Sequence, residues 1–203
     1  MTKRSYVSEV RAAAAAEKRE RVVQAAQRLL REDSIAGFSL DTVAKAAGVT
    51  RLTVYNQFGS RRGLLEAAFD DIALSGGLPR LAEVMAGPDP RHAIDELIDV
   101  FCAFWSGDPA VIALHDAMAI DGEFAQALRE RNERRRGNLA ILVDRVLAGR
   151  GSKRSRADAI DLMYSLTSCA TYRSLSEGRS NRAVASILKA ACADILDRLL
   201  DEA

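Results

Sequence analysis

Apolar residues recur along the chain at the three- and four-residue spacing of α-helices rather than the two-residue spacing of β-strands. Near the start, Val22, Ala26, Leu29 and Leu30 line one face of a predicted helix over about residues 18–32. The sequence holds no run of alternating β-branched residues. The apolar pattern therefore predicts an all-α fold.

Three short helices are predicted next, and each is preceded by a hydroxyl residue that can cap its first turn. Gly48 separates the first two, because glycine adopts a positive φ without strain. The predicted caps and helices are Ser39 before residues 40–47, Thr50 before residues 51–58, and Ser60 before a helix that begins at Arg61.

The remaining chain alternates longer helices with loops that carry proline or glycine. Ser155 and Asp158 have the spacing of a capping box, which places the start of one long helix there, and Gly178 ends it. The predicted helices cover about residues 91–105, a short stretch within 110–120, and then 123–147, 155–177 and 181–200.

The two short helices around Gly48 have the spacing of a helix-turn-helix. Ala44 keeps the first helix slim where the second must cross it, and Val43 and Val54 supply an apolar cluster inside the angle. In this motif the second helix enters the major groove of DNA. A small helical subdomain with a polar surface is the competing interpretation.

The outward face of that second helix carries the side chains that such a role needs. Arginine pairs with guanine, asparagine or glutamine pairs with adenine, and a methyl group contacts thymine. Hydroxyl and basic groups suit phosphate oxygens. The candidate DNA-binding residues are Ser39, Thr50, Arg51, Leu52, Thr53, Tyr55, Asn56, Gln57 and Arg61.

The stretch FSLDTVAKAAGVTRLTVYNQFGSRRGLL resembles the DNA-binding segment of the TetR family of bacterial transcriptional regulators. The resemblance covers about residues 18–70 and departs from the family pattern at two positions. Leu52 replaces a small residue, and Gln57 stands where histidine or tyrosine is common. The resemblance implies that Arg51, Leu52, Thr53 and Asn56 face bases, while Ser39, Thr50, Tyr55, Gln57 and Arg61 mostly hold phosphates.

The same resemblance implies a ligand-responsive regulator, usually a repressor, that binds a palindromic operator as a dimer and is released by a small-molecule effector. The expected parts are a flexible basic N-terminal extension over residues 1–17, the DNA-binding domain over 18–70, and an effector-binding and dimerisation domain over 71–203. The long amphipathic helices predicted at residues 155–177 and 181–200 would form the homodimer contact.

Large apolar residues with a few polar tips indicate where an apolar or aromatic effector could bind. Such residues at helical spacing are also typical of an ordinary core, and both interpretations remain open. His115 and Tyr164 are the stronger candidates, because buried polar tips need partners. The candidate pocket residues are Phe101, Phe104, Trp105, Leu114, His115, Met118, Met163, Tyr164 and Tyr172.

Composition adds little to this picture but narrows the class of protein. Net charge is +1, yet residues 1–67 hold 12 Lys or Arg and 7 Asp or Glu, whereas residues 68–203 hold 17 and 21. A basic first third is a minor indication that this end meets a polyanion. The charge-rich run at residues 129–138 is interpreted as a solvated helix face rather than an RNA-binding segment.

Other function classes lack their signatures. The three cysteines form no CxxC pair, which predicts buried free thiols in the reducing cytoplasm. No metal site, cofactor motif, catalytic motif or membrane-spanning run is recognisable. Two rivals to the regulator remain, namely a helical enzyme and a helical small-molecule-binding protein without sequence-specific DNA binding, toward which Leu52 is the one hint.

Overall fold

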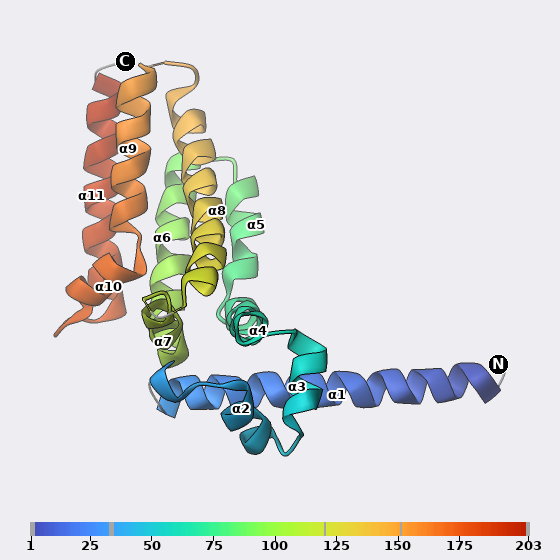
Figure 1. Cartoon of the computed structure of the whole chain (residues 1–203). Coiled ribbons are helices and arrows are strands. Elements are labelled where there is room, and N and C mark those ends of the chain that lie inside the picture. The colour runs from blue at the N-terminus through green and yellow to red at the C-terminus, as the bar shows by residue number, and fades with distance from the viewer. Residues whose placement is uncertain (1–2, 33–34, 120, 151, 202–203) are drawn as a thin grey trace. The chain divides into compact units, whose positions relative to one another are not determined.

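The computed structural model describes residues 3–32, 35–119, 121–150 and 152–201, and these form helices without a strand (Figure 1). The all-α fold predicted from apolar spacing is therefore confirmed for the described residues. The chain packs as two compact units, one made of residues 1–72 and 109–125, the other of residues 73–108 and 126–203. Two helices, α4 (Arg61–Ser75) and α8 (Gly122–Leu147), begin in the first unit and continue into the second.

The first unit is built around α1 (Lys3–Glu32), which packs against α2 (Leu40–Ala47) and α7 (Pro109–Ala117). The short helix η1 (Ile35–Gly37) precedes α2, and α3 (Arg51–Phe58) packs against α2. These bounds match the sequence prediction for α2, α3 and the start of α4, because local caps and glycines determine them.

Apolar side chains at helical spacing form the core of this unit. Val22 and Ala26 of α1 are fully buried, as are Val43 of α2 and Val54 of α3 inside the helix-turn-helix angle. Polar links add to the packing, since the Gln27 amide donates to a carboxylate oxygen of Asp71 at 2.7 Å. The guanidinium of Arg19 lies 4.6 Å from the ring centre of Phe58, at the end of α3.

The first helix is longer than the sequence prediction, which placed its start at about residue 18. In the structure α1 begins at Lys3. The alanine run at residues 12–16 has the highest helix propensity of any residue type, so the helix extends through it. Residues 12–21 are exposed, which explains why no apolar periodicity marks this part of the helix.

The second unit contains the remaining helices, and α11 packs against both α6 and α9. Ion pairs join α11 to α6 at the surface, with Lys189 Nζ 2.6 Å from Asp99 Oδ2 and Arg91 Nη2 2.6 Å from Asp197 Oδ1. The helices are η2 (Leu78–Arg80), α5 (Leu81–Ala86), α6 (Pro90–Gly107), α9 (Lys153–Leu166), α10 (Cys169–Ser176) and α11 (Asn181–Asp201).

The predicted single helix over residues 155–177 is wrong, because the structure divides it into α9 and α10. Thr167 ends α9, and its hydroxyl donates to the Met163 carbonyl at 2.9 Å. The Thr167 carbonyl accepts a hydrogen bond from Trp105 Nε1 at 3.1 Å, and Ser168 then caps α10. The capping box assigned to Ser155 is also wrong, since the preceding Ser152 caps α9.

Gly63 and Gly137 offer a matched test of the packing between α3 and α4. A Cβ atom on Gly63 would overlap the carbonyl oxygen of Phe58, whereas one on Gly137 in the exposed part of α8 would meet nothing within 4 Å. We expect Gly63→Ala to lower the free energy of unfolding by about 1–3 kcal/mol. Gly137→Ala should raise it by about 0.5–1 kcal/mol. Urea unfolding followed by circular dichroism measures both, and an unchanged Gly63→Ala would show that α3 and α4 are not in close contact.

Candidate functional site

The turn between α2 and α3 depends on a left-handed residue. Gly48 has φ 65°, and its N–H donates to the carbonyl of Lys45 at 3.3 Å. The next N–H, from Val49, donates to the carbonyl of Ala44 at 3.0 Å. These two bonds satisfy carbonyls in the last turn of α2 while the chain reverses, and the residue after Val49, Thr50, is already the N-cap of α3.

Side-chain caps determine where both helices begin. Ser39 Oγ accepts from the backbone N–H of Thr42 at 3.1 Å, and Thr42 Oγ1 accepts from the N–H of Ser39 at 2.9 Å. Thr50 Oγ1 accepts from the N–H of Thr53 at 3.2 Å. Each cap satisfies a backbone donor that would otherwise lack a partner in the first turn. The start of α3 is therefore set by side chains from the motif itself.

The face of α3 that is expected from the sequence to point outward is exposed in part. Arg51, Leu52, Tyr55 and Asn56 are exposed, and Leu52 has an exposed fraction of 66%. Arg51 Nε lies 3.3 Å from Asp41 Oδ2 in an ion pair at the surface. Four neighbouring side chains of mixed chemistry thus stand on one side of the helix.

The other candidate DNA-binding residues are less available. Thr53 and Gln57 are half-buried, and the Gln57 Oε1 atom is buried without a hydrogen-bond donor among the described residues. The hydroxyls of Ser39 and Thr50 accept the capping bonds. Of the residues expected to hold phosphates, Thr50 and Tyr55 are exposed, and Tyr55 has an exposed fraction of 55%.

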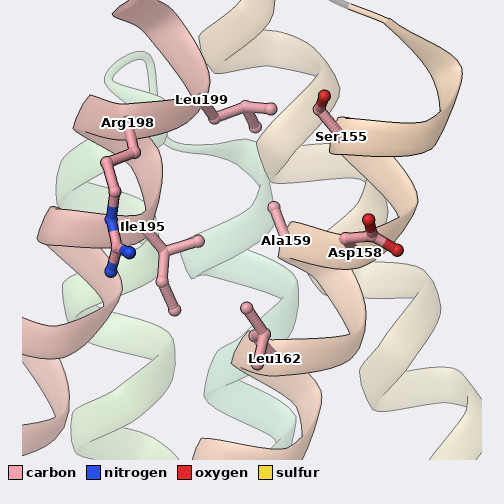
Figure 2. Close-up of a pocket in the computed structure, with 7 residues that line it drawn as sticks. All are labelled: Ser155, Asp158, Ala159, Leu162, Ile195, Arg198 and Leu199. Carbon is pink, nitrogen blue, oxygen red and sulfur yellow. The ribbon is translucent and has the colours of Figure 1, made fainter. Parts of the chain in front are cut away.

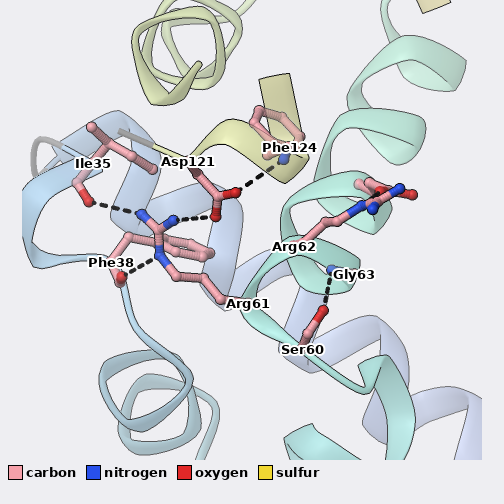
Figure 3. A network of polar contacts seen from close by, with 9 residues as sticks. Ile35, Phe38, Ser60, Arg61, Arg62, Gly63, Asp121 and Phe124 are labelled. Carbon is pink, nitrogen blue, oxygen red and sulfur yellow. Dashed lines mark hydrogen bonds and ion pairs between the residues drawn. The ribbon is translucent and has the colours of Figure 1, made fainter. Parts of the chain in front are cut away.

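Arg61, also expected to hold a phosphate, is directed into the first unit instead. Its Nε donates to the Phe38 carbonyl at 3.0 Å, its Nη2 donates to the Ile35 carbonyl at 3.4 Å, and its Nη1 lies 2.8 Å from Asp121 Oδ2 (Figure 3). The other carboxylate oxygen of Asp121 accepts from the N–H of Phe124 at 2.9 Å in the first turn of α8. Arg61 therefore links the start of α4 to the chain before α2 and to the start of α8.

The candidate pocket residues fall into both units. Leu114 is buried and His115 and Met118 are half-buried in α7 and the turn after it, within the first unit. His115 Nδ1 lies 2.9 Å from the carbonyl of Val111 in its own helix. The candidates in the second unit are the half-buried Tyr164 and the buried Phe101, Phe104, Trp105, Met163 and Tyr172.

Aromatic stacking joins three of these residues on α6. The Trp105 ring centre lies 5.7 Å from that of Phe101 and 5.0 Å from that of Phe104. Two cavities of the second unit are lined by other residues. One, of about 190 Å³, is a groove between α9 and α11 (Figure 2), and the other, of about 360 Å³, lies beside Arg91 and Leu196.

Family models match most of the chain. Residues 22–68 match the model for bacterial regulatory proteins of the tetR family, and residues 88–200 match the tetracyclin repressor-like C-terminal domain. The second match alone covers more than half of the chain. The chain belongs to the TetR family.

Individual relatives agree with this assignment. The transcriptional regulator EthR of Mycolicibacterium smegmatis is 33% identical over 91 residues, 44% of this chain and 42% of that protein. The regulator AlkX of Mycobacterium tuberculosis is 44% identical over 48 residues, 24% of this chain and 23% of that protein. The alignments thus span less than half the length of these curated relatives. A TetR-family protein from Rhodococcus shares the fold, with a TM-score of 0.70, 20% identity, and coverage of 89% of this chain and 99% of that one.

Residues 129–138 are expected from the sequence to form a solvated helix face. In this TetR-family chain, however, one arginine of that run is buried. Arg135 of α8 has an exposed fraction of 4%. Sequence reasoning missed it because charged neighbours surround it. A signal was present, since Arg135 lies seven residues after Leu128 and seven before Leu142, both buried on the inward face of α8.

The three cysteines are free and buried, as predicted. Burial, followed by the nearby Asp99 carboxylate, raises the pKa of Cys102 to about 11, and burial followed by Asp95 raises the pKa of Cys192 to about 12. Both thiols therefore stay protonated at neutral pH and are poor nucleophiles.

The described residues include no group of three or more His, Cys, Asp or Glu arranged to hold a metal ion. Among those same residues, no single helix is both long and apolar enough to cross a membrane, although the bent pair α6 and α7 reaches that length and composition together.

The ion pair of Arg61 and Asp121 should contribute to the stability of the first unit. The two side chains are 27% and 18% exposed, so removing one charge leaves the other poorly solvated. We expect Asp121→Asn to lower the free energy of unfolding by about 1–3 kcal/mol. Asp144→Asn removes the exposed pair with Arg156 and should cost less than about 1 kcal/mol. Equal costs in urea unfolding would contradict a supporting role for the Arg61 contact.

Proposed function

We propose that the protein is a ligand-responsive transcriptional regulator, most simply a cytoplasmic repressor, that binds a palindromic operator as a dimer. The exposed face of α3 carries this proposal. Arg51, Leu52, Tyr55 and Asn56 stand together on a capped helix after a tight turn, and packing needs none of them. Membership of the TetR family, whose curated relatives are named as HTH-type transcriptional regulators, supports the same function.

Each exposed residue has a role that its chemistry permits. Arg51 donates two hydrogen bonds to guanine, and Asn56 pairs with adenine. Leu52 contacts a thymine methyl, which would account for its exposed position on α3. Tyr55 donates to a phosphate oxygen. The capping hydroxyls of Ser39 and Thr50 lie 3.1 Å and 2.9 Å from the hydroxyls of Thr42 and Thr53, and a phosphate at the groove edge competes with these neighbours for the hydroxyl protons.

The homodimer forms through α9 and α11, which overlap the two stretches expected to form it, residues 155–177 and 181–200. Leu162 is 55% exposed and Ile187 is 42% exposed, and the groove between the two helices is partly apolar. Figure 2 shows Ala159 and Leu162 from α9 and Ile195 and Leu199 from α11 around this groove, with Asp158 and Arg198 on opposite sides. Two such faces, one from each protomer, form a four-helix contact. The dimer places two recognition helices about 34 Å apart, one turn of DNA.

The effector acts by population shift. It binds among the apolar and aromatic residues of the C-terminal part and favours a state in which the two recognition helices do not match successive grooves. Because α4 and α8 both continue from the first unit into the second, a displacement of either helix reaches the unit that carries α3.

Selection of bound sequences from a random duplex pool, at a stated near-physiological salt concentration, tests the function directly. A recovered palindrome with half-sites about one helical turn apart would support a dimeric operator binder. Weak binding without sequence preference and with a steep salt dependence would refute it and favour a small-molecule-binding protein that does not read DNA.

Replacing a base-reading residue should weaken operator binding and relax specificity at one position. We expect Asn56→Ala and Arg51→Ala each to cost about 1–3 kcal/mol of binding free energy. Arg134→Ala removes an exposed arginine from α8 and should leave operator affinity unchanged. Fluorescence anisotropy with the selected duplex measures all three, and wild-type affinity in Asn56→Ala would remove α3 from base recognition.

A charge on the α9–α11 face should break the dimer. We expect Leu162→Glu to raise the dimer dissociation constant at least about tenfold, because burying an unpaired carboxylate is costly. Ile141→Glu changes a residue of similar exposure, 52%, on α8 and should leave the dimer intact. Analytical ultracentrifugation distinguishes the two. Dissociation by Ile141→Glu, with Leu162→Glu still dimeric, would move the interface to α8.

A further inference from the structure

Arg135 is the one charged residue among the buried side chains of the described chain. It projects from α8 within the second unit, where aromatic rings surround its guanidinium. The ring centre of Tyr164 lies 4.4 Å from the Arg135 Cζ, and that of Phe101 lies 5.6 Å away. The Trp105 ring stacks on Phe101. These three aromatic residues were candidates for the effector pocket on sequence grounds.

The hydrogen bonds of Arg135 are incomplete. Nη1 donates to Thr167 Oγ1 at 3.1 Å, whereas Nε is buried and has no acceptor among the described residues. No carboxylate of those residues lies within ion-pair distance of the guanidinium. The neighbouring Arg136 differs in this respect, because it pairs with Asp161 and is 40% exposed. Arg135 therefore keeps a buried charge without a direct carboxylate partner, and a hydrogen bond to the Tyr164 side chain and the charge of Glu133 stabilise it in part.

The edge of the guanidinium that carries the unpaired Nε has a defined shape. Nε and Nη2 point the same way in a planar fork, and two such N–H groups match the two oxygens of a carboxylate. Burial lowers the pKa of Arg135, and Tyr164 raises it. A guanidinium stays protonated at neutral pH even when its pKa is lowered. The site thus offers a fixed positive charge with a two-donor edge, enclosed by aromatic surface.

Support of the α9–α10 break does not account for this residue. The break needs a partner for Thr167, but the Thr167 hydroxyl already bonds to the Met163 carbonyl, and the Thr167 carbonyl is held by Trp105. An apolar side chain in place of Arg135 would pack against the same rings without a desolvation penalty. The charge is explained if an anion from outside completes the site.

We propose that Arg135 binds the carboxylate of an organic acid whose apolar body packs against Phe101 and Trp105. This identifies the chemical class of the effector, and it rests on the proposed function only for the consequence that binding has on DNA. Half-buried Tyr164 covers the guanidinium on one side, and its ring moves aside when the carboxylate enters.

Direct binding tests the inference without reference to DNA. The probes are decanoate and 3-phenylpropanoate, each compared with its neutral primary amide, and the readout is the fluorescence of Trp105, the single tryptophan of the chain. We expect the full-length protein to bind each carboxylate at least about tenfold more tightly than its amide. Equal affinities for acid and amide, or no binding of either acid, would overturn the proposal.

Variants of adjacent arginines separate recognition from folding. Arg135→Met should remove the preference for the carboxylate while keeping the fold, which thermal unfolding by circular dichroism verifies. Arg134→Met changes the exposed neighbour and should bind the acids as the wild type does. Retention of the preference in a folded Arg135→Met would contradict the assignment, and so would its loss in Arg134→Met.

The two proposals fail separately. If the protein selects a palindromic duplex but shows no preference for carboxylates, this inference alone is overturned. If the protein prefers the acids through Arg135 but selects no DNA sequence, this inference is supported and the proposed function is contradicted. When both hold, decanoate releases the selected duplex from the wild type and not from Arg135→Met.

Discussion

A single guanidinium joins the chain segments that present α3. Arg61 meets two carbonyls of the link between α1 and α2, those of Ile35 and Phe38, and the carboxylate of Asp121. The Ile35 carbonyl also accepts from the N–H of Phe38 at 3.2 Å, and Arg61 adds a side-chain donor to each of the two carbonyls. The same residue opens α4, directly after the recognition helix. The placement of α3 therefore combines this contact at the start of α4 with the packing of α3 against α2, in which Val54 is fully buried.

Local signals explain which parts of the fold could be predicted. The bounds of α2 and α3 follow from the caps at Ser39 and Thr50 and from the left-handed Gly48, all within a few residues of the helix ends. The α9–α10 break could not be predicted, because it depends on Trp105, 62 positions before Thr167 in the sequence. The extension of α1 to Lys3 was not predicted because an exposed alanine helix has no apolar stripe.

The candidate site also has a part that could be predicted from the sequence and a part that could not. Side-chain chemistry and the family resemblance singled out Arg51, Leu52 and Asn56, and all three are exposed on α3. The direction of Arg61 depends on Asp121, 60 positions away, and no spacing rule connects the two. A run of charged residues does not show which of its members are buried. Arg135 is buried, whereas its neighbour Arg136 lies at the surface. The position of each arginine on α8 relative to the buried leucines determines whether it faces the core or the solvent.

The ion pair between Arg51 and Asp41 has a consequence for how DNA would be read. Both side chains are well exposed, at 66% and 71%, so the pair is weak and exchanges readily with solvent. On an operator, Arg51 would trade a carboxylate for a guanine edge instead of gaining a first partner. At sites that lack the guanine, the arginine can stay with Asp41, and the complex suffers no stranded charge. Asp41 would thus act as a weak competitor that slightly lowers the discrimination between bases at this one position.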